Sequence, residues 1–433
     1  MDAGADHRCT GRAVPDGAQA DVLVIGAGAI GLWTSVKLAE RGARVVVLDR
    51  DEPGTGASFG NAGLLTPSLS LPLARPGAVR QALRWTLSPS SPFTIHPSLD
   101  PSLAGWLLRF AIAGRKNTFE RNTHAMVRLC LASMDDWRAL DRVARPTGIG
   151  LSSAGLLALY ESEESHGQGL RLAELTGRSG VRWESWGADR LRDEEPIVSD
   201  PIRHAIHYPH DGFAEPDRAM HRLRAHAIGL GVRIIDRSPV RGLLLCGDRV
   251  RAIQTPSCHL RADDIVIAAG VWTGGLARQL GLKIPMRSAK GYSMLLPRGR
   301  AHPRRALYLA QRRVTVTPHE SLLRLAGTLE ICGDDRSINH RRADAILRGA
   351  TRMLRIPPPD RRPEVWAGLR PCLSDGMPMI GRLARFSNIW VSTGHQMTGF
   401  KCAPASAQII AEQIGGEASS MELAPFAPSR FGL

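Results

Sequence analysis

Lysine is scarce in this 433-residue sequence, and it has no metal-type cysteine spacing and no long apolar run. Seven cysteines are scattered without C-x-x-C spacing, and their odd number fits neither a disulfide framework nor a zinc site. The most apolar helical stretch, residues 103–113, is too short to span a bilayer. The first residues lack the apolar core of a signal peptide, so we expect a disordered leader over 1–20 and a cytoplasmic location.

The charge of the chain is strongly positive. Lysine and arginine total 56 against 41 acidic residues, which gives a formal net charge of +15. Arginine supplies almost all of this charge and is spread along the chain without a long basic run. That distribution argues against a nucleic-acid partner. It is compatible with weak peripheral association with the anionic inner face of the cytoplasmic membrane.

A glycine-rich turn opens the folded part of the sequence. It follows a continuous apolar run over residues 22–25 and leads through a helical pattern to a second apolar run over residues 45–48. Its first glycine permits the tight turn, the second lets the backbone approach a pyrophosphate, and the third lets helix and strand pack closely. A carboxylate that ends the second run can accept ribose hydroxyls. These features predict a dinucleotide site at Val22, Gly26, Gly28, Gly31, Asp49 and Arg50.

The fingerprint alone does not distinguish NAD from FAD, so an NAD-linked dehydrogenase stays open. Residues 54–63 favour FAD, because a run of small residues replaces the alternating helices and strands usual in a nicotinamide enzyme. Such a run lets backbone amides pass close to an extended ligand. A flexible loop is the alternative interpretation. The contacts expected from this segment are Ser58, Asn61, Ala62 and Gly63.

Two later segments can approach the same ligand. An apolar strand over residues 264–270 ends in Ala269 and Gly270. Further on, Gly394 and Gly399 bracket a turn before a predicted helix, where N–H groups and the positive helix end could stabilise a reduced, anionic flavin. A simple N-cap turn is the alternative.

Four histidines are candidate functional residues. His395 lies inside the turn between the two glycines and is a candidate acid or base, although it could equally serve through its backbone. His204, His207 and His210 are spaced by three residues, but their side chains alternate between the faces of a predicted strand, so we expect no metal site.

Several segments together resemble the D-amino-acid dehydrogenases, within the wider D-amino-acid oxidase and glycine oxidase superfamily. The resemblance implies non-covalent FAD, with Gly26 to Asp49 on the pyrophosphate and ribose, Asn61 to Gly63 beside the flavin, and Val240 on the adenine. It also implies oxidative deamination of a D-amino acid to a 2-oxo acid and ammonia, with electrons passed to a respiratory acceptor such as a quinone. The matching segments are VLVIGAGAIGLWTSVKLAERGARVVVLDR, GTGASFGNAGLLTPSLSLPLARPG, PMRSAKGYSMLLP, RLAGTLEICGDD, WAGLRPCLSDGMPMIG and VSTGHQMTGFKCAPASAQIIAEQIGG.

Arg370, in the sequence Gly-Leu-Arg-Pro, matches the family's carboxylate-binding arginine. A guanidinium offers a planar, bidentate and permanently charged partner for a substrate carboxylate. The sequence also departs from its relatives. Met397 occupies the slot of a second arginine, residues 314–316 offer no pocket tyrosine, and Cys372 does not align with a flavin-tethering cysteine.

We therefore expect an α/β protein with a Rossmann-like FAD-binding domain and an α+β substrate domain built on an antiparallel sheet. Two other activities stay open, namely oxidation of a cyclic or secondary amine of the D-hydroxyproline, sarcosine or glycine type, and a flavin-binding subunit or RNA-associated module without turnover. The FAD domain is predicted from residues 20–65, 150–160, 232–275 and 365–415, the substrate domain from 66–149, 161–231 and 276–364, and a loose tail from 416–433.

Overall fold

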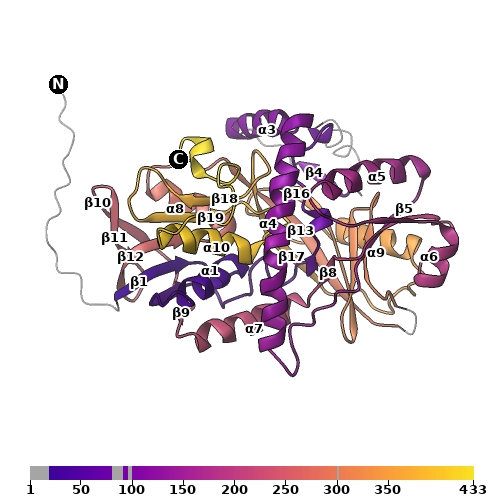
Figure 1. Ribbon diagram of the computed structural model, residues 1–433, viewed down its shortest axis with the longest axis horizontal. Coiled ribbons are helices and arrows are strands. Elements are labelled where there is room, and N and C mark those ends of the chain that lie inside the picture. The colour runs from indigo at the N-terminus through magenta and orange to yellow at the C-terminus, as the bar shows by residue number, and fades with distance from the viewer. Residues whose placement is uncertain (1–18, 80–90, 96–99, 300–301) are drawn as a thin grey trace.

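The computed structural model describes residues 19–79, 91–95, 100–299 and 302–433. The predicted leader over 1–20 lies outside these ranges apart from its last two residues, which already belong to the first strand. Two sheets occupy opposite ends of the long axis of the molecule, and the long helix α4 (Lys116–Val143) passes between them (Figure 1).

The first sheet has the Rossmann-like arrangement predicted from the glycine fingerprint. Strand β1 is its parallel centre, with Val24 beside Val47 on one side and Val266 on the other. Eight strands form it, in the order β10-β11-β12-β1-β2-β9, with β19 beside β12 and β18 beside β19. Their bounds are β1 (Gln19–Ile25), β2 (Val45–Leu48), β9 (Arg233–Ile235), β10 (Gly242–Cys246), β11 (Arg249–Gln254), β12 (His259–Ile267), β18 (Met379–Arg382) and β19 (Ile389–Thr393).

Helices cover one face of this sheet. Residues from α1 (Ala29–Ala39), α7 (Pro216–Gly229), α10 (Ala403–Ile414) and α4 share one buried core, in which the rings of Trp33 and Trp137 meet edge to face. Leu32, Leu223 and Ile409 are fully buried there. Burial of these apolar faces, more than helix propensity, holds the helices on the sheet.

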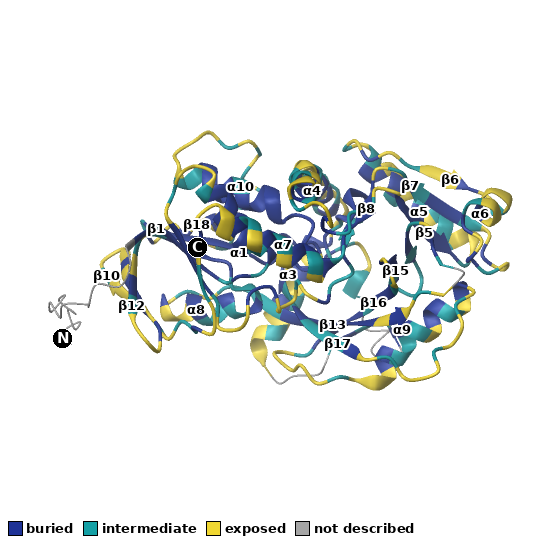
Figure 2. Cartoon of the chain, turned by 90° about the horizontal axis from the view of Figure 1, so that it is seen from below, coloured by how far each residue is buried: buried dark blue, intermediate teal, exposed yellow. Residues whose placement is uncertain are grey.

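The second sheet is mostly antiparallel, as predicted for a substrate domain. It has nine strands in the order β17-β13-β16-β15-β14-β5-β7-β6, with β4 beside β16. Helix α9 (His340–Met353) packs on it through Ile346. Figure 2 shows the strands of both sheets largely buried, whereas outer helices such as α6 (Ala188–Glu194) are largely exposed. The strands are β4 (Phe93–Ile95), β5 (Leu156–Tyr160), β6 (Glu184–Trp186), β7 (His204–Tyr208), β13 (Met286–Pro297), β14 (Ala306–Leu309), β15 (Val314–Pro318), β16 (Leu322–Ile331) and β17 (Val365–Leu373).

The remaining described elements lie between or around the two sheets. They are a ribbon of two short strands, short 3-10 helices and further α-helices. They are β3 (Leu64–Leu65), β8 (Gly212–Phe213), η1 (Pro67–Leu69), η2 (Gly270–Trp272), η3 (Pro428–Phe431), α3 (Pro101–Ala113), α5 (Glu163–Gly177) and α8 (Thr273–Gln279).

Three boundaries differ from those predicted from the sequence. β5, placed by the sequence in the FAD domain with residues 150–160, pairs with β14 and β7 in the second sheet. All five of its residues are buried, which gives the same apolar run as a Rossmann strand. β17, from the segment 365–415, also joins the second sheet, and α7, from the segment 161–231, packs on α1.

The C-terminal tail is packed and not loose. The side chain of Phe426 is 1 % exposed, and the backbone N–H of Ile380 donates to its carbonyl oxygen at 2.9 Å. Arg430 donates from Nε to the carboxylate of Asp375 at 2.7 Å. The prolines and serines of residues 416–433 suggested a coil, but one buried aromatic and one ion pair fix the segment to the first sheet.

Candidate active site

A cavity of about 750 Å³ lies between the two sheets and receives residues from both. Pockets of this size are typical of cofactor and small-molecule sites. Eleven of the predicted cofactor contacts and both predicted catalytic residues line it, although they come from distant parts of the chain. These residues are Gly26, Gly28, Asp49, Arg50, Ser58, Asn61, Ala62, Val240, Ala269, Gly270, Gly399, Arg370 and His395.

The glycine turn has no room for side chains. Gly26 has φ +110°, and a Cβ there would lie 2.5 Å from the carbonyl oxygen of Ala268. A Cβ on Gly31 would lie 1.7 Å from the carbonyl oxygen of Gly26. The turn therefore packs directly on β12 and on the first turn of α1, whose N-terminal N–H groups face the cavity end lined by Gly28. This backbone cradle fits the pyrophosphate of a dinucleotide.

Asp49 has a structural role besides the predicted ribose contact. Its Oδ2 accepts from the N–H of Ala27 at 2.6 Å, and its Oδ1 accepts from the N–H of Asp51 at 2.9 Å. Burial raises the pKa of this carboxyl group, and the two backbone N–H groups oppose that rise. The carboxylate thus fixes the glycine turn relative to β2 while it lines the cavity.

Neighbouring residues close the nucleotide end of the cavity. Ser58 Oγ accepts from the N–H of Ala29 at 3.0 Å and so ties the small-residue segment to the start of α1. The guanidinium carbon of Arg50 lies 3.6 Å from the centroid of the Trp272 ring. Val240 lines the same end of the cavity. The arrangement fits an adenosine end held between β2, β9 and η2.

Four predicted contacts shape the site without lining it. Val22 is buried in β1 between its partners on β2 and β12, and Gly31 serves the helix–strand packing described above. Gly63 has φ +69° and donates its N–H to Oδ1 of Asn61 at 2.6 Å. A Cβ on Gly394, which has φ +79°, would lie 2.3 Å from the side chain of Leu373. The structure therefore places these residues behind the cavity wall.

His395 is held as a neutral, buried residue. Its side chain is 2 % exposed, and Nε2 lies 3.0 Å from the Ser406 hydroxyl on α10. Burial lowers the pKa of the imidazole to about 3, so the ring is neutral and only weakly basic near neutral pH. Its carbonyl oxygen accepts from the N–H of Thr398 at 2.8 Å. This geometry favours the turn-forming role over that of an acid or base.

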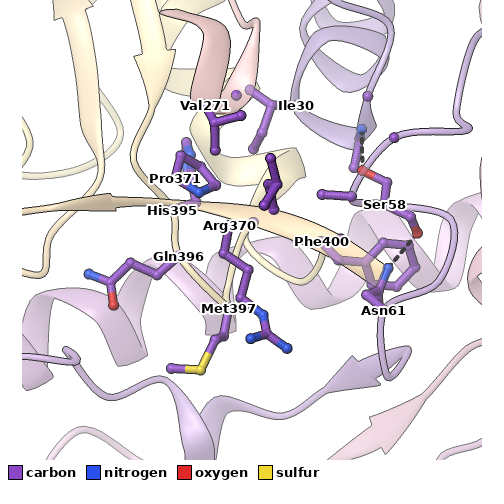
Figure 3. A pocket seen from close by; sticks show the side chains of 18 of the residues that line it. Ile30, Ser58, Asn61, Val271, Arg370, Pro371, His395, Gln396, Met397 and Phe400 are labelled. Carbon is purple, nitrogen blue, oxygen red and sulfur yellow. Dashed lines mark hydrogen bonds between the residues drawn. The ribbon is translucent and has the colours of Figure 1, made fainter. Parts of the chain in front are cut away.

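Arg370 extends from β17 into the cavity (Figure 3). Its Nη1 donates to the carbonyl oxygen of Thr328 at 2.8 Å, and no acidic residue in the described ranges forms an ion pair with it. Burial lowers the pKa of the guanidinium, which nevertheless stays charged at neutral pH. A Cβ on Gly291 of β13 would lie 2.1 Å from the guanidinium. A buried cation with open donors is a site for a carboxylate.

Several cavity residues were not found from the sequence. The ring of Trp366 fills the space that Cβ atoms on Gly60 and Gly368 would occupy. Tyr308 and Arg313, on β14 and in the turn before β15, face the cavity, as does Arg75 from the segment after η1. Glycine at positions 60 and 368 was a signal that a large side chain packs against both. Arg75 and Arg313 were not distinguished from the many other arginines of the chain.

No group of three or more histidine, cysteine or acidic residues suited to a metal ion occurs in the described ranges. His207, one of the three spaced histidines, lies against the ring of Trp186 at 4.5 Å between centroids. No helix in the described part of the chain has both the length and the apolar character needed to cross a membrane.

Comparison with known proteins identifies the family. Residues 21–413 match the family described as FAD dependent oxidoreductase. The chain is 31% identical to a D-amino acid dehydrogenase from Paramagnetospirillum magneticum and 28% identical to a D-amino-acid oxidase from Bradyrhizobium diazoefficiens, covering 95% of this chain and 98% of each relative. The crystal structure of glycine oxidase from Geobacillus kaustophilus shares the fold, with a TM-score of 0.76 at 19% identity over 95% of this chain and 99% of that one. This chain thus belongs to the FAD-dependent oxidoreductases.

Proposed function

We propose that this enzyme oxidises the bond between the α-carbon and the nitrogen of a D-amino acid. The observation that carries the proposal is the guanidinium of Arg370, buried in the FAD cavity without an acidic partner among the described residues. The relatives named D-amino acid dehydrogenase and D-amino-acid oxidase support this substrate class. The imino acid formed would hydrolyse to a 2-oxo acid and ammonia.

Binding and orientation are the main tasks of the protein side chains. Arg370 would hold the substrate carboxylate, while Thr328 fixes the guanidinium through its carbonyl oxygen. The positive charge of Arg370 favours the neutral amine over the ammonium form, so a lone pair is available when the α-hydrogen leaves. When bound, FAD supplies the acceptor for that hydride. His395 would not act as a base, because burial makes its ring only weakly basic and its Nε2 is engaged by Ser406.

The FAD is proposed to be held without a covalent bond. None of the described residues that line the cavity is a cysteine. Cys372, two residues after Arg370, is fully buried among apolar residues that include Trp106, and burial raises the pKa of its thiol to about 12. A protonated thiol outside the cavity is a poor nucleophile toward a flavin. Acid precipitation should therefore release all of the yellow colour into solution.

A quinone or another respiratory carrier is the proposed electron acceptor, with peripheral attachment to the inner face of the cytoplasmic membrane. The net charge of +15 would attract an anionic bilayer. Leu108 and Ile112, one turn apart on α3, are 64% and 46% exposed and would add apolar contact. Co-sedimentation with anionic vesicles at low and high salt tests the attachment.

Flavin reduction under anaerobic conditions tests the substrate class. We expect D-amino acids to bleach the flavin band near 450 nm, while L-enantiomers, sarcosine and D-hydroxyproline do so at least tenfold more slowly. Bleaching by no amine at all would overturn the proposal. Parallel assays with oxygen and with an artificial quinone would then separate an oxidase from a dehydrogenase.

Replacement of Arg370 tests the carboxylate site. We expect Arg370→Ala to raise KM about 100-fold or more, since a charged hydrogen-bonded pair in a buried site contributes roughly 3 kcal/mol. FAD should stay bound, because Arg370 lies away from the glycine turn. Arg361→Gln, an exposed arginine, is the matched control. An unchanged KM in Arg370→Ala would remove the residue from this role.

A further inference from the structure

A second group of cationic and hydroxyl side chains faces the same cavity as Arg370. Tyr308 pairs with Thr315 across β14 and β15, and Thr315 pairs with Ala326 on β16. Because directly paired residues of antiparallel strands project to the same face, these side chains share one face of the second sheet. All three line the cavity, and so does Arg313, at the start of β15.

Two arginines of this group lie close to each other. Arg313 donates from Nη1 to the hydroxyl of Tyr308 at 2.7 Å. Burial, and after it the positive charge of Arg313, lowers the pKa of Arg75 to about 10. Arg75 reaches the cavity from the segment after η1, whose backbone packs against Gly114 at the end of α3. Two different parts of the fold therefore bring like charges together at one place.

Acidic side chains do not balance this charge within the described cavity wall. The acidic residues that line it are Asp49, Asp51 and Glu52, all at the nucleotide end. Arg313 has no ion pair with any described residue. A cation such as Arg313 that faces a cavity without an acidic partner is suited to bind an anion.

Thr328 connects this group with Arg370. It sits at an irregularity in the pairing of β13 with β16 and has φ +67°, a conformation that is strained for a β-branched residue. Its carbonyl oxygen accepts from Arg370, and the preceding residue, Gly327, pairs with Val314 directly after Arg313. The side chain is 8 % exposed, and its Oγ1 has no hydrogen-bond partner. This short run of β16 therefore joins Arg370 to Arg313, and both cations line the same cavity.

We propose that the preferred substrate is an amino acid with a second carboxylate, of the aspartate or glutamate type. Its α-carboxylate would bind Arg370, and its side-chain carboxylate would bind Arg313, Arg75 and the hydroxyl of Tyr308. This inference rests on the proposed function and adds the side-chain specificity to it.

Binding of inert acids tests the second anion site without turnover. Glutarate and valerate have the same chain length but differ by one carboxylate. We expect calorimetry on the FAD-loaded enzyme to give a dissociation constant at least tenfold lower for glutarate, and Arg313→Gln to abolish that difference. Arg75→Gln is a second variant for the case that the first does not fold, and Arg361→Gln should keep the wild-type preference. Equal affinity for the two acids in the wild type would overturn the inference.

Steady-state turnover tests the same preference for a second carboxylate in the reaction itself. D-Glutamate and D-glutamine are nearly isosteric. The ratio of kcat/KM for D-glutamate to that for D-glutamine therefore reports the effect of the side-chain charge. We expect a ratio of at least ten in the wild type and below one in Arg313→Gln. A wild-type ratio near one would overturn the inference and leave the proposed function standing. No flavin reduction by any amino acid, with the glutarate preference intact, would overturn the proposed function and leave only the second anion site standing.

Discussion

At the scale of single residues, the sequence motifs identified Arg370 but not the other arginines that line the cavity. Arg370 was predicted because it lies in a motif that marks one arginine among many, and the structure places it in the cavity. Arg313 lies outside every segment that carries the resemblance, and Arg75 lies within one of them without a pattern that marks it as a ligand. His395 shows the opposite error, since residue type suggested acid–base chemistry and burial argues against it.

Gly291 is expected to control the position of Arg370. A Cβ on this glycine would lie 2.1 Å from the Arg370 guanidinium, so Gly291→Ala should push that side chain out of place. We expect a rise in KM of tenfold or more with FAD content unchanged, because Gly291 does not line the glycine turn. Steady-state kinetics and the ratio of absorbance at 280 and 450 nm measure both effects. A variant with wild-type KM would show that the guanidinium has free space on that side.

The neutral state of His395 predicts a pH dependence of stability. Its folded pKa of about 3 lies below the unfolded value of 6.5, so the unfolded chain takes up a proton that the folded chain refuses between these values. The free energy of unfolding is therefore unaffected by this group above pH 6.5 and falls by about 1.4 kcal/mol per pH unit below it.

Urea denaturation of wild type and His395→Gln at pH 7.5 and 5.0 measures this contribution. The stability difference between the two proteins should shift by about 2 kcal/mol in favour of the variant at the lower pH. We expect kcat of the variant to fall less than tenfold, because a general acid or base would contribute about 100-fold or more. A constant difference would mean that the ring is already protonated or accessible in the fold.

At the scale of elements, periodicity predicted isolated helices and strands well. The apolar runs over residues 22–25 and 45–48 lie in β1 and β2, and the helix predicted after the glycine turn of residues 394–399 is α10. Helices α5, α6 and α9 were missed. In α9, the apolar face of Ala343, Ile346 and Ala350 lies among many arginines, and the sequence pattern was not recognised as amphipathic.

The glycine turn and α1 are expected to fail together when their contact is lost. Gly31→Ala would place a Cβ 1.7 Å from the carbonyl oxygen of Gly26, so the helix start must move away from the turn. We expect purified protein with less than a tenth of the wild-type flavin. Gly105→Ala on α3 is the control, because no atom lies within 4 Å of its Cβ, and it should stabilise the fold by about 0.5–1 kcal/mol. Full flavin content in Gly31→Ala would contradict the assigned role of this packing.

At the scale of the whole molecule, the sequence predicted two domains but not how the chain divides between them. β5 and the FAD-domain strands carry the same continuous apolar pattern, and only long-range pairing decides which sheet each joins. The chain enters the second sheet at β4 and β5, returns to the first at α7 and β9, and crosses again at β13 and β18. These crossings between the two sheets produce no local sequence pattern.

We expect FAD to bind both halves of this interleaved topology at once, because the cavity is lined by residues of each sheet. A ligand that binds only the folded state stabilises it by about 2.7 kcal/mol at a concentration 100-fold above its dissociation constant. Thermal unfolding of deflavinated protein should therefore shift upward with added FAD and converge on the Tm of the purified holoenzyme. Circular dichroism in the far and near ultraviolet should report one coincident transition once FAD is bound, because neither sheet can open without exposing the shared site. A flavin-independent Tm, or a second sheet that melts alone in the presence of saturating FAD, would show that the cofactor is anchored by the first sheet only.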